Sequence, residues 1–415
     1  MKILIVGNGG REHAIAWKVA QNPKVEKIYC APGNGGTALM DKCENIDIEG
    51  IDSLADFAQE NIVNLTIVGP EVPLVNGIVD HFKERGLKIF GPSKKAAALE
   101  GSKSFSKDFM KKYGVKTAAY EVFYERDKAL QYLEVCNYPI VIKADGLAAG
   151  KGVVICENYS QAEDTIIKFM VEDMFGDAGK KVVIEEFLVG VEASILSITD
   201  GKVILPFISS KDHKQIYDED KGPNTGGMGA IAPNPYVTEE VMEDFNENIL
   251  KPTLKGINEE NFDFRGIIFF GVMITKKGAY LLEYNVRMGD PETQAVLPLM
   301  DSDLVELIEA SLNNELSSFD LKWKKGNSCC VVAVSEGYPG KYEKGFKINM
   351  PKEVNSFVAA GIFKGGNLLT NGGRVLCTYA VENNLEDSIN KAYKEMGKID
   401  FHGIYFRKDI GKLRY

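Results

Sequence analysis

Short apolar runs separated by long polar stretches dominate the first hundred residues. Four of these runs are rich in β-branched residues: KILIV at 2–6, KIYCA at 27–31, LTIV at 65–68 and LKIF at 87–90. The stretches between them are long enough for helices, which predicts a parallel sheet whose strands are buried on both faces. Each run ends in a glycine or proline turn. These turns should meet along the carboxyl edge of the sheet, where such folds bind ligands.

The middle of the chain predicts a mixed, largely antiparallel region that begins near Lys116. The segments NYPIVIKADG at 137–146 and KKVVIEEFLVG at 180–190 predict strands. Between them, Ser160 and Glu163 predict a capping box that opens a helix ending near residue 172.

Two further β-rich pairs predict hairpins, one turning at 200–201 and the other at 276–278. From about Cys329 the chain becomes glycine-rich and strand-rich, and LEDSINKAYKEM at 385–396 predicts one amphipathic helix. The sequence therefore predicts a multidomain α/β and α+β protein.

Composition excludes several classes of protein. A chain of 415 residues has room for roughly two to four domains. A net charge of −10 argues against binding nucleic acid by neutralising phosphates. No stretch approaches the ~20 apolar residues of a membrane span. The seven scattered cysteines contain no C-x-x-C spacing, so we expect reduced thiols and a cytoplasmic protein.

The segment GNGGREHA at 7–14 follows the first apolar run and raises the question of a dinucleotide-binding loop. That loop needs G-x-G-x-x-G, but Glu12 stands where the third glycine should be. It also needs an acid at the end of the second strand, which instead ends Cys30, Ala31, Pro32. What the pattern does predict is a helix starting at about Arg11, whose free N–H groups favour an anion such as a substrate phosphate.

Two glycine loops are candidates for binding a phosphorylated ligand. No Gly-Lys pair is followed by Ser or Thr, so the Walker A loop is absent. VIKADGLAAGKGV places Lys143 at a strand end and Lys151 in a glycine loop, which suits a polyphosphate, although such loops are also common surface turns. GPNTGGMGA at 222–230 is a second loop that we expect to close over a ligand.

The strongest local signal is LEYNVRMGDPE at 282–292. Period-two alternation in a strand puts Glu283, Asn285 and Arg287 on one face and turns Leu282, Tyr284 and Val286 toward the core. Carboxylate and amide oxygens two residues apart suit a hard cation such as Mg²⁺, beside which Arg287 would hold an anionic group. The alternative interpretation is an exposed polar face of an edge strand.

These segments together resemble the phosphoribosylamine–glycine ligase family, the glycinamide ribonucleotide synthetases of the ATP-grasp superfamily. The resemblance covers essentially the whole chain. It rests on these motifs: GNGGREHA, APGN, LTIVGPE, KIFGPS, EGSK, IKADGLAAGKGV, IEEFL, EAS, KDHK, GPNTGGMGA, LEYN to GDPE, TNGGRVL and RKDIG. It implies an ATP-grasp fold. The expected domains are a parallel α/β domain at 1–100, an ATP-grasp domain at 101–325 with a lid at about 116–190, and a mixed domain at 326–415.

The family implies ATP-dependent ligation of glycine to 5-phosphoribosylamine through glycyl phosphate, in purine biosynthesis. The resemblance implies that Lys103, Lys143 and Lys151 contact ATP phosphates, that the backbone at Glu185, Glu186, Phe187 and Leu188 reads the adenine, and that Glu192 holds the ribose. Glu283 and Asn285 match the ligands of Mg²⁺ or Mn²⁺. The implied catalytic residues are Arg287, Lys143 and Asp212. The implied substrate-binding residues are Gly9, Gly10, Arg11, Glu12, Asp212, Asn224, Thr225, Gly226, Gly227 and Arg287.

The sequence departs from the family pattern at two positions, and the residues at both positions are apolar or small. Met288 precedes GDPE where a phenylalanine is usual, and PGNGG replaces PGNAG. We expect Met288 to fill the same apolar slot. For His213 in KDHK we favour a structural or positioning role over that of a general base, since the amine nucleophile attacks unprotonated.

Three alternative interpretations stay open at this point. A sibling ATP-grasp ligase would act on another carboxylate, a nicotinamide dehydrogenase would bind NADH, and a nucleotide sensor would bind ATP without turnover. The 222–230 loop argues against the first, the missing glycine and acid against the second, and the retained lysines and Glu283 against the third. We expect a monomer, with a dimer as the alternative, and small-molecule substrates rather than nucleic acid or membrane as partners.

Overall fold

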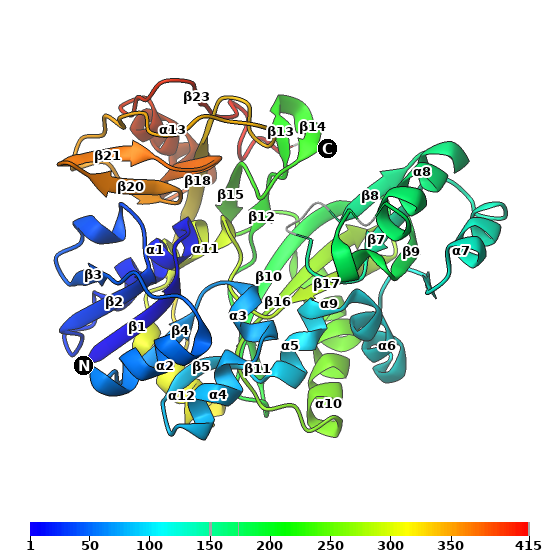
Figure 1. Cartoon of the computed structure of the whole chain (residues 1–415), viewed down its shortest axis with the longest axis horizontal. Coiled ribbons are helices and arrows are strands. Elements are labelled where there is room, and N and C mark those ends of the chain that lie inside the picture. The colour runs from blue at the N-terminus through cyan, green and yellow to red at the C-terminus, as the bar shows by residue number, and fades with distance from the viewer. Residues whose placement is uncertain (149–151, 173, 414–415) are drawn as a thin grey trace.

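The computed structural model describes residues 1–148, 152–172 and 174–413. In Figure 1 the blue N-terminal elements and the orange and red C-terminal elements lie side by side. The green elements of the middle region continue away from them, and a small sheet with two helices lies at the far end of the long axis.

The four apolar runs form parallel strands, as predicted, and a short fifth strand joins them. Their order in the sheet is β3-β2-β1-β4-β5. The strands are β1 Lys2–Gly7, β2 Lys27–Pro32, β3 Cys43–Asn45, β4 Leu65–Val68 and β5 Ile89–Pro92. The helices between and after them are α1 Gly10–Val19, α2 Ile51–Glu60, α3 Glu71–Val75, α4 Ile78–Glu84 and α5 Lys94–Gly101.

Both faces of this sheet are buried, which explains why its strands are continuously apolar. Ile3 and Ile5 of β1 join a core cluster that extends into the C-terminal region. Leu4 and Val6 point the other way and join a cluster that includes residues of α2, α4 and α5. The period of two along one strand therefore connects the N-terminal sheet to two different cores.

The N-terminal sheet continues without a break into the middle of the chain. The strands β10 Val191–Thr199, β11 Ile204–Pro206, β16 Phe264–Thr275 and β17 Gly278–Asn285 form the two predicted hairpins. β16 pairs antiparallel with β5 at Phe264–Pro92 and Arg265–Gly91, which makes one nine-stranded sheet. Sequence patterns did not predict this junction because it pairs segments more than 170 residues apart.

The small sheet is antiparallel and has its own core. Its order is β6-β9-β7-β8, with β6 Tyr120–Phe123, β7 Ile140–Ala144, β8 Val153–Cys156 and β9 Val182–Glu186. The helices α7 Arg126–Leu133 and α8 Tyr159–Met170 share its apolar cluster. The predicted capping box was wrong: Asn158 is the N-cap of α8, and its side chain accepts from the Gln161 N–H, so Ser160 already lies in the first turn.

A third sheet joins residues of the middle and the end of the chain. Its order is β12-β15-β18-β22-β19, and β23 also pairs with β18. The strands are β12 Lys211–Asp212, β15 Gly229–Ala232, β18 Asn327–Ser335, β19 Ser356–Val358, β22 Arg374–Glu382 and β23 Ile404–Tyr405. Two separate hairpins are β13 Gln215–Tyr217 with β14 Lys221–Asn224, and β20 Gly361–Lys364 with β21 Asn367–Thr370. The helix α13 Leu385–Met396, as predicted, packs on β18 and β22.

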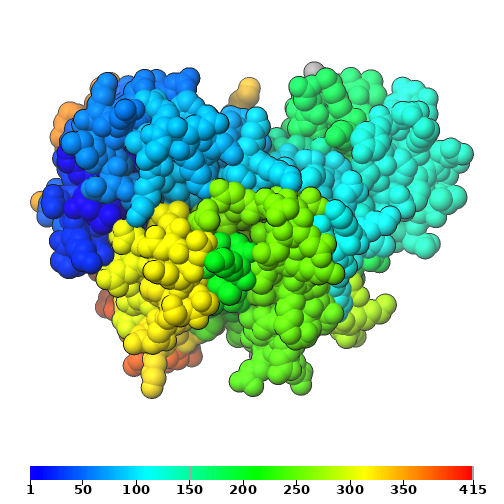
Figure 2. Space-filling model, turned by 90° about the horizontal axis from the view of Figure 1, so that it is seen from below, coloured from blue at the N-terminus to red at the C-terminus, as the bar shows by residue number. Residues whose placement is uncertain are grey.

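The remaining helices complete the middle region: α6 Lys103–Tyr113, α9 Glu239–Phe245, α10 Lys251–Glu259, α11 Glu292–Val296 and α12 Leu304–Leu312. Figure 2 shows one face on which the yellow segment containing α12 lies beside the blue N-terminal residues. Within the described part of the chain, no helix is both long and apolar enough to cross a membrane.

The closing RKDIG motif fastens the end of the chain to the β13–β14 hairpin. Arg407 is 1% exposed, and its guanidinium donates to Asp409 at 2.8 and 2.9 Å and to the Gln215 carbonyl at 3.0 Å. It also lies 3.0 Å from the Asp220 carboxylate. Arg407 is thus a buried charge with one counter-ion two residues along the chain, Asp409, and a second from a distant segment, Asp220.

We expect Arg407→Met to destabilise the protein by about 3–5 kcal/mol, because the substitution leaves a buried carboxylate without its partner. Urea unfolding followed by tryptophan fluorescence measures this change. Arg126→Met is the matched control, since Arg126 pairs with Asp127 in solvent and should cost about 1 kcal/mol or less. Equal midpoints for the two variants would contradict this expectation.

Candidate functional site

A cleft of about 410 Å³ opens where the large sheet, the small sheet and the C-terminal sheet meet. Of the residues predicted to form a site, it brings together Arg11, Lys103, Lys143, Glu185, Asp212, Thr225, Gly226, Glu283, Asn285 and Arg287. These residues come from all three sheets and from the helices beside them. The cleft therefore exists only in the assembled chain.

Other predicted site residues are described but do not line this cleft: Gly9, Gly10, Glu12, Glu186, Phe187, Leu188, Glu192, Asn224 and Gly227. Glu186 is exposed and accepts from the Ala119 N–H at 2.8 Å, while Glu192 forms an ion pair with Lys214. Asn224 lines a separate groove together with residues of β13, β23 and the connection that follows β18. Lys151 lies outside the described residues.

Two lysines share one buried carboxylate at the floor of the cleft. Glu185, in β9, is 3% exposed and lies 2.9 Å from Nζ of Lys143 and 3.2 Å from Nζ of Lys107. Lys107 also donates to the Thr117 hydroxyl at 2.7 Å, and Lys143 donates to the Leu282 carbonyl at 3.3 Å. Lys107 was not predicted as a site residue, although its position four residues after Lys103 places both on one face of α6.

Strand β17 presents its polar residues to the cleft, with one correction to the predicted alternation. A bulge opposite Gly271 and Val272 lets Glu283 and Leu281 pair with neighbouring residues of β16, so that Leu282 is left over. Leu282 therefore lines the cleft with Glu283, and the buried residue is Leu281 instead. The prediction that Leu282 faces the core was wrong for this reason.

Glu283 is an ionised carboxylate without a direct partner. Burial alone would raise the pKa of Glu283, but the positive charges of Lys214, Lys143 and Lys103 bring it below its ordinary value. No described residue forms a hydrogen bond or an ion pair with its carboxylate. Such an oxygen can bind a cation, and the Asn285 side-chain oxygen lies two residues along the same face.

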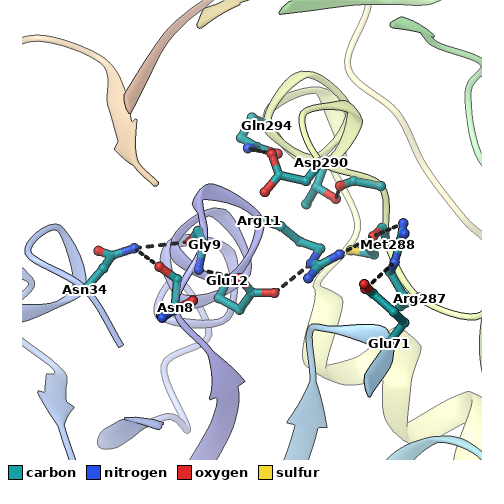
Figure 3. Close-up of polar contacts among 12 residues, drawn as sticks. Asn8, Gly9, Arg11, Glu12, Asn34, Glu71, Arg287, Met288, Asp290 and Gln294 are labelled. Carbon is teal, nitrogen blue, oxygen red and sulfur yellow. Dashed lines mark hydrogen bonds and ion pairs between the residues drawn. The ribbon is translucent and has the colours of Figure 1, made fainter. Parts of the chain in front are cut away.

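Arg287 is held by three neighbouring side chains, of which Figure 3 shows Glu71. It donates to Glu71 at 3.2 Å and to the Asn285 oxygen at 3.1 Å, and it lies 3.0 Å from Glu100. Burial would lower the pKa of Arg287, but Glu100 and Glu71 raise it. Protein carboxylates thus fix the orientation of the Arg287 guanidinium near Glu283.

The glycine turn before α1 holds a carboxylate of the protein itself. The Gly9 N–H donates to Oε2 of Glu12 at 2.6 Å, and Arg11 donates to Oε1 at 2.6 Å (Figure 3). Gly7 is needed here, because its φ is +125° and a Cβ would lie 2.6 Å from Cγ of Glu12. A Cβ on Gly9 would lie 2.7 Å from Oε2 of Glu12 and would displace the carboxylate. Arg11 also donates to the Met288 carbonyl at 3.0 Å and is the residue of this turn that reaches the cleft.

Asp212, at the end of β12, lies next to Gly227 in the predicted glycine loop at 222–230; strands β14 and β15 take up the ends of this segment, and 225–228 connects them. Its Oδ1 accepts no hydrogen bond from any described residue, and a Cβ on Gly227 would lie 2.6 Å from it. Burial, together with the negative charge of Glu292, raises the pKa of Asp212 well above its ordinary value. The sequence predicted Asp212 as a catalytic and substrate-binding residue but gave no sign of its buried, unpaired oxygen.

The C-terminal region contributes Arg374 to the lining, which sequence analysis also missed. Arg374 opens β22 and donates to the carbonyls of Gly226 at 2.6 Å and Asp290 at 2.9 Å. The TNGGRVL motif was a usable signal, since two glycines before an arginine indicate close backbone packing.

His213 has a structural position, as expected. It is 4% exposed, its Nε2 accepts from the Gly411 N–H at 3.2 Å, and its Nδ1 lies 3.2 Å from the Gly229 carbonyl. Burial and the charge of Arg407 lower the pKa of His213 to about 4. Both ring nitrogens are engaged by backbone, so neither is available to take a proton from a substrate.

Comparisons with known proteins match the whole length of the chain. Models of the N domain, the ATP-grasp (A) domain and the C domain of phosphoribosylglycinamide synthetase match residues 1–100, 101–293 and 328–413. The phosphoribosylamine–glycine ligase of Clostridium acetobutylicum is 65% identical over 416 residues, which is 100% of both chains.

The solved structures agree with these matches. The crystal structure of phosphoribosylamine–glycine ligase from Thermotoga maritima is 34% identical and covers 99% of this chain and 100% of that one, with a TM-score of 0.88. A biotin carboxylase domain from Hydrogenobacter thermophilus, in complex with MgADP and bicarbonate, is 16% identical and covers 97% of this chain and 91% of that one, with a TM-score of 0.75; it shows the fold alone. The ATP-grasp fold with flanking N and C domains, expected from the sequence, is confirmed.

We expect Lys107→Met to change how stability depends on pH. Burial lowers the pKa of Lys107 to about 8, below the ordinary value of 10.5. Between these values the unfolded chain binds more protons, so raising the pH from 8 to 10.5 should stabilise the folded wild type by up to about 3 kcal/mol. Thermal unfolding midpoints across this range should show the gain in the wild type and lose it in the variant.

Lys111→Met is the control for this measurement, because Lys111 is exposed on the same helix. It should follow the wild type at every pH. A Lys107→Met protein that also follows the wild type would contradict the assignment of a buried, titrating lysine.

Proposed function

Because this chain belongs to the phosphoribosylglycinamide synthetase family, we propose that the cleft between its three sheets is where it performs the reaction of that family. The reaction is the ATP-dependent ligation of glycine to 5-phosphoribosylamine in purine biosynthesis. A carboxylate oxygen of glycine attacks the γ-phosphorus of ATP, which releases ADP and forms glycyl phosphate. The amine of 5-phosphoribosylamine then attacks the glycyl carbonyl, forms the amide and displaces phosphate.

No protein nucleophile is needed for these two steps, so the work of the protein is to position the reactants and stabilise charge. We propose that Lys103, Lys143 and Lys151 bind the ATP phosphates and that the backbone from Glu185 to Leu188 binds the adenine. Two observations support this: Lys103 and Lys143 line the cleft, and apolar Met110 and Leu282 line it as well.

The buried Glu185 carboxylate keeps Lys143 pointed into the cleft before ATP arrives. The Glu192 carboxylate would hold the ribose hydroxyls while still paired with Lys214, because a carboxylate has lone pairs for both.

Enzymes of this family use ATP with a divalent metal ion. We propose that Glu283 and Asn285 hold this ion, as Mg²⁺ or Mn²⁺, where it would neutralise charge on the transferred phosphoryl group. The donor set fits, because an ionised carboxylate without a protein partner and an amide oxygen are hard ligands, and Mg²⁺ takes few protein ligands. Among the described residues no group of three or more His, Cys, Asp or Glu forms a larger metal cage.

On the substrate side we propose that Arg287 and Arg11 bind anionic groups and that Asp212, Asn224, Thr225, Gly226 and Gly227 hold the amine-bearing substrates. The unpaired Oδ1 of Asp212 supports this, since it would accept from an ammonium or amine. Gly9, Gly10 and Glu12 would act through Arg11, because the Glu12 carboxylate already occupies the N–H of Gly9. Arg287, Lys143 and Asp212 are the proposed catalytic residues.

We also propose a cytoplasmic location and a monomer, with a dimer as the alternative. All seven cysteines are free, which agrees with a reducing compartment. Sedimentation velocity of the purified chain distinguishes the two oligomeric states.

The single observation that carries the proposal is the unpartnered Glu283 carboxylate among the cations of one cleft. ADP release tests it, with ATP, Mg²⁺, glycine and 5-phosphoribosylamine generated from ribose 5-phosphate and ammonia. We expect ADP only when both substrates are present. Release that ignores glycine but needs another carboxylate would indicate a sibling ligase, and ATP binding without release would indicate a sensor.

We expect Glu283→Ala to lower kcat/KM by about 100-fold or more, because it removes a charged ligand at the reacting phosphates. Circular dichroism should show an intact fold. Glu240→Ala, an exposed position on α9, should match the wild type. Near-normal turnover of Glu283→Ala with an unchanged metal requirement would reject the metal assignment.

A further inference from the structure

We propose that Tyr338 is a positioning residue for the ligation: together with Arg374, it clamps the glycine loop at 222–230 from the C-terminal region. This inference rests on the proposed function of the cleft. Tyr338 lies in the connection between β18 and β19 and does not line the cleft itself. It acts through the loop.

Both polar backbone atoms of Gly226 are held by the C-terminal region. The Gly226 N–H donates to the Tyr338 hydroxyl at 3.1 Å, and Arg374 donates to the Gly226 carbonyl at 2.6 Å. A Cβ at Gly226 would lie 2.8 Å from Cζ of Arg374, so only glycine allows this approach. Two opposed contacts on one residue determine where the loop lies, which a single contact would not do.

The tyrosine is itself held firmly. Its N–H donates to the Ser335 carbonyl at 3.1 Å, and the Ser335 hydroxyl donates to the Gly372 carbonyl at 2.9 Å. The ring occupies the space that a Cβ on Gly373 would need. Tyr338 is thus packed on the residue that precedes Arg374, and the two halves of the clamp form one unit.

The opposite side of the loop is tied to the wall of the cleft. The N–H and the hydroxyl of Thr225 both donate to the Lys214 carbonyl, at 2.8 and 2.7 Å, and the Gly227 N–H donates to the Thr225 hydroxyl at 2.9 Å. Gly227 in turn covers the unpaired Oδ1 of Asp212. Any displacement of Gly226 therefore changes the space above Asp212, where the amine-bearing substrates are proposed to bind.

The fold places this clamp at the junction of two regions. Figure 1 shows the β13–β14 hairpin, which leads into the loop, beside the C-terminal strands β18 and β23. On its outer side Tyr338 lines a separate groove with Tyr217 and Tyr405. The C-terminal region thus takes part in the reaction by fixing the segment that covers Asp212, where the amine-bearing substrates are proposed to bind.

Tyr338→Phe tests the clamp, because it removes the hydroxyl and keeps the ring. We expect the KM for glycine or for 5-phosphoribosylamine to rise about 2- to 10-fold, the value of one hydrogen bond. The KM for ATP and the thermal midpoint should stay unchanged. Hydrogen exchange of a peptide covering 222–230 should become faster in the variant, which provides a readout independent of activity.

Tyr342→Phe is the matched control. Its ring lies 6.3 Å from that of Tyr338, it is 37% exposed, and its hydroxyl has no hydrogen-bond partner among the described residues. It should match the wild type in both measurements.

The clamp proposal is overturned if Tyr338→Phe keeps wild-type hydrogen exchange at 222–230 and wild-type KM values. It is also overturned if the KM for ATP rises as much as the KM for glycine or 5-phosphoribosylamine. Because the wild type is assayed alongside, a loss of the clamp is distinguished from a failure of the proposed function. In the latter case ADP release by the wild type itself would not require both substrates.

Discussion

The free-energy cost of removing charged side chains from water governs how this cleft is built. As many acidic as basic side chains line the described cleft. Desolvating an ion costs several kcal/mol unless a partner compensates it. Glu185 compensates Lys143 and Lys107, and Glu100 with Glu71 compensates Arg287. These carboxylates let the cleft collect the cations that the proposed polyphosphate site needs without leaving them uncompensated. Glu283 and Oδ1 of Asp212 have no such partner among the described residues, and these two are the cleft-lining acids proposed to meet ligands.

The large sheet supplies the rigid frame that keeps these charges apart and aligned. Because β5 pairs with β16, the N-terminal strands and the strand carrying Glu283 belong to one hydrogen-bonded layer. Arg11 therefore meets the segment around Met288 although 277 residues separate them. The bulge near Leu282 adds local twist at the point where the strand must turn its polar residues into the cleft.

The C-terminal region contributes both to the hydrophobic core and to the cleft. It shares one core cluster with β1 and α1, and its sheet includes two strands from the middle of the chain. Arg374 is its contribution to the cleft lining, and Tyr338 holds the same loop from behind. An arrangement in which three regions each supply part of one site explains why no single region contains a complete set of functional groups.

Local patterns of apolar and polar residues in the sequence determined most of the strands and helices. Alternating and continuous apolar runs gave the parallel strands, both hairpins and the helix at 385–396, because backbone geometry repeats over a few residues. Glycine loops and the polar face of β17 were readable for the same reason. Only the folded chain shows which distant groups meet, such as Lys107 with Glu185 and Arg374 with Gly226. Such pairs depend on packing between segments far apart in sequence, and burial, which shifts the pKa of Lys107 and Asp212, is a property of the assembled cleft rather than of either residue.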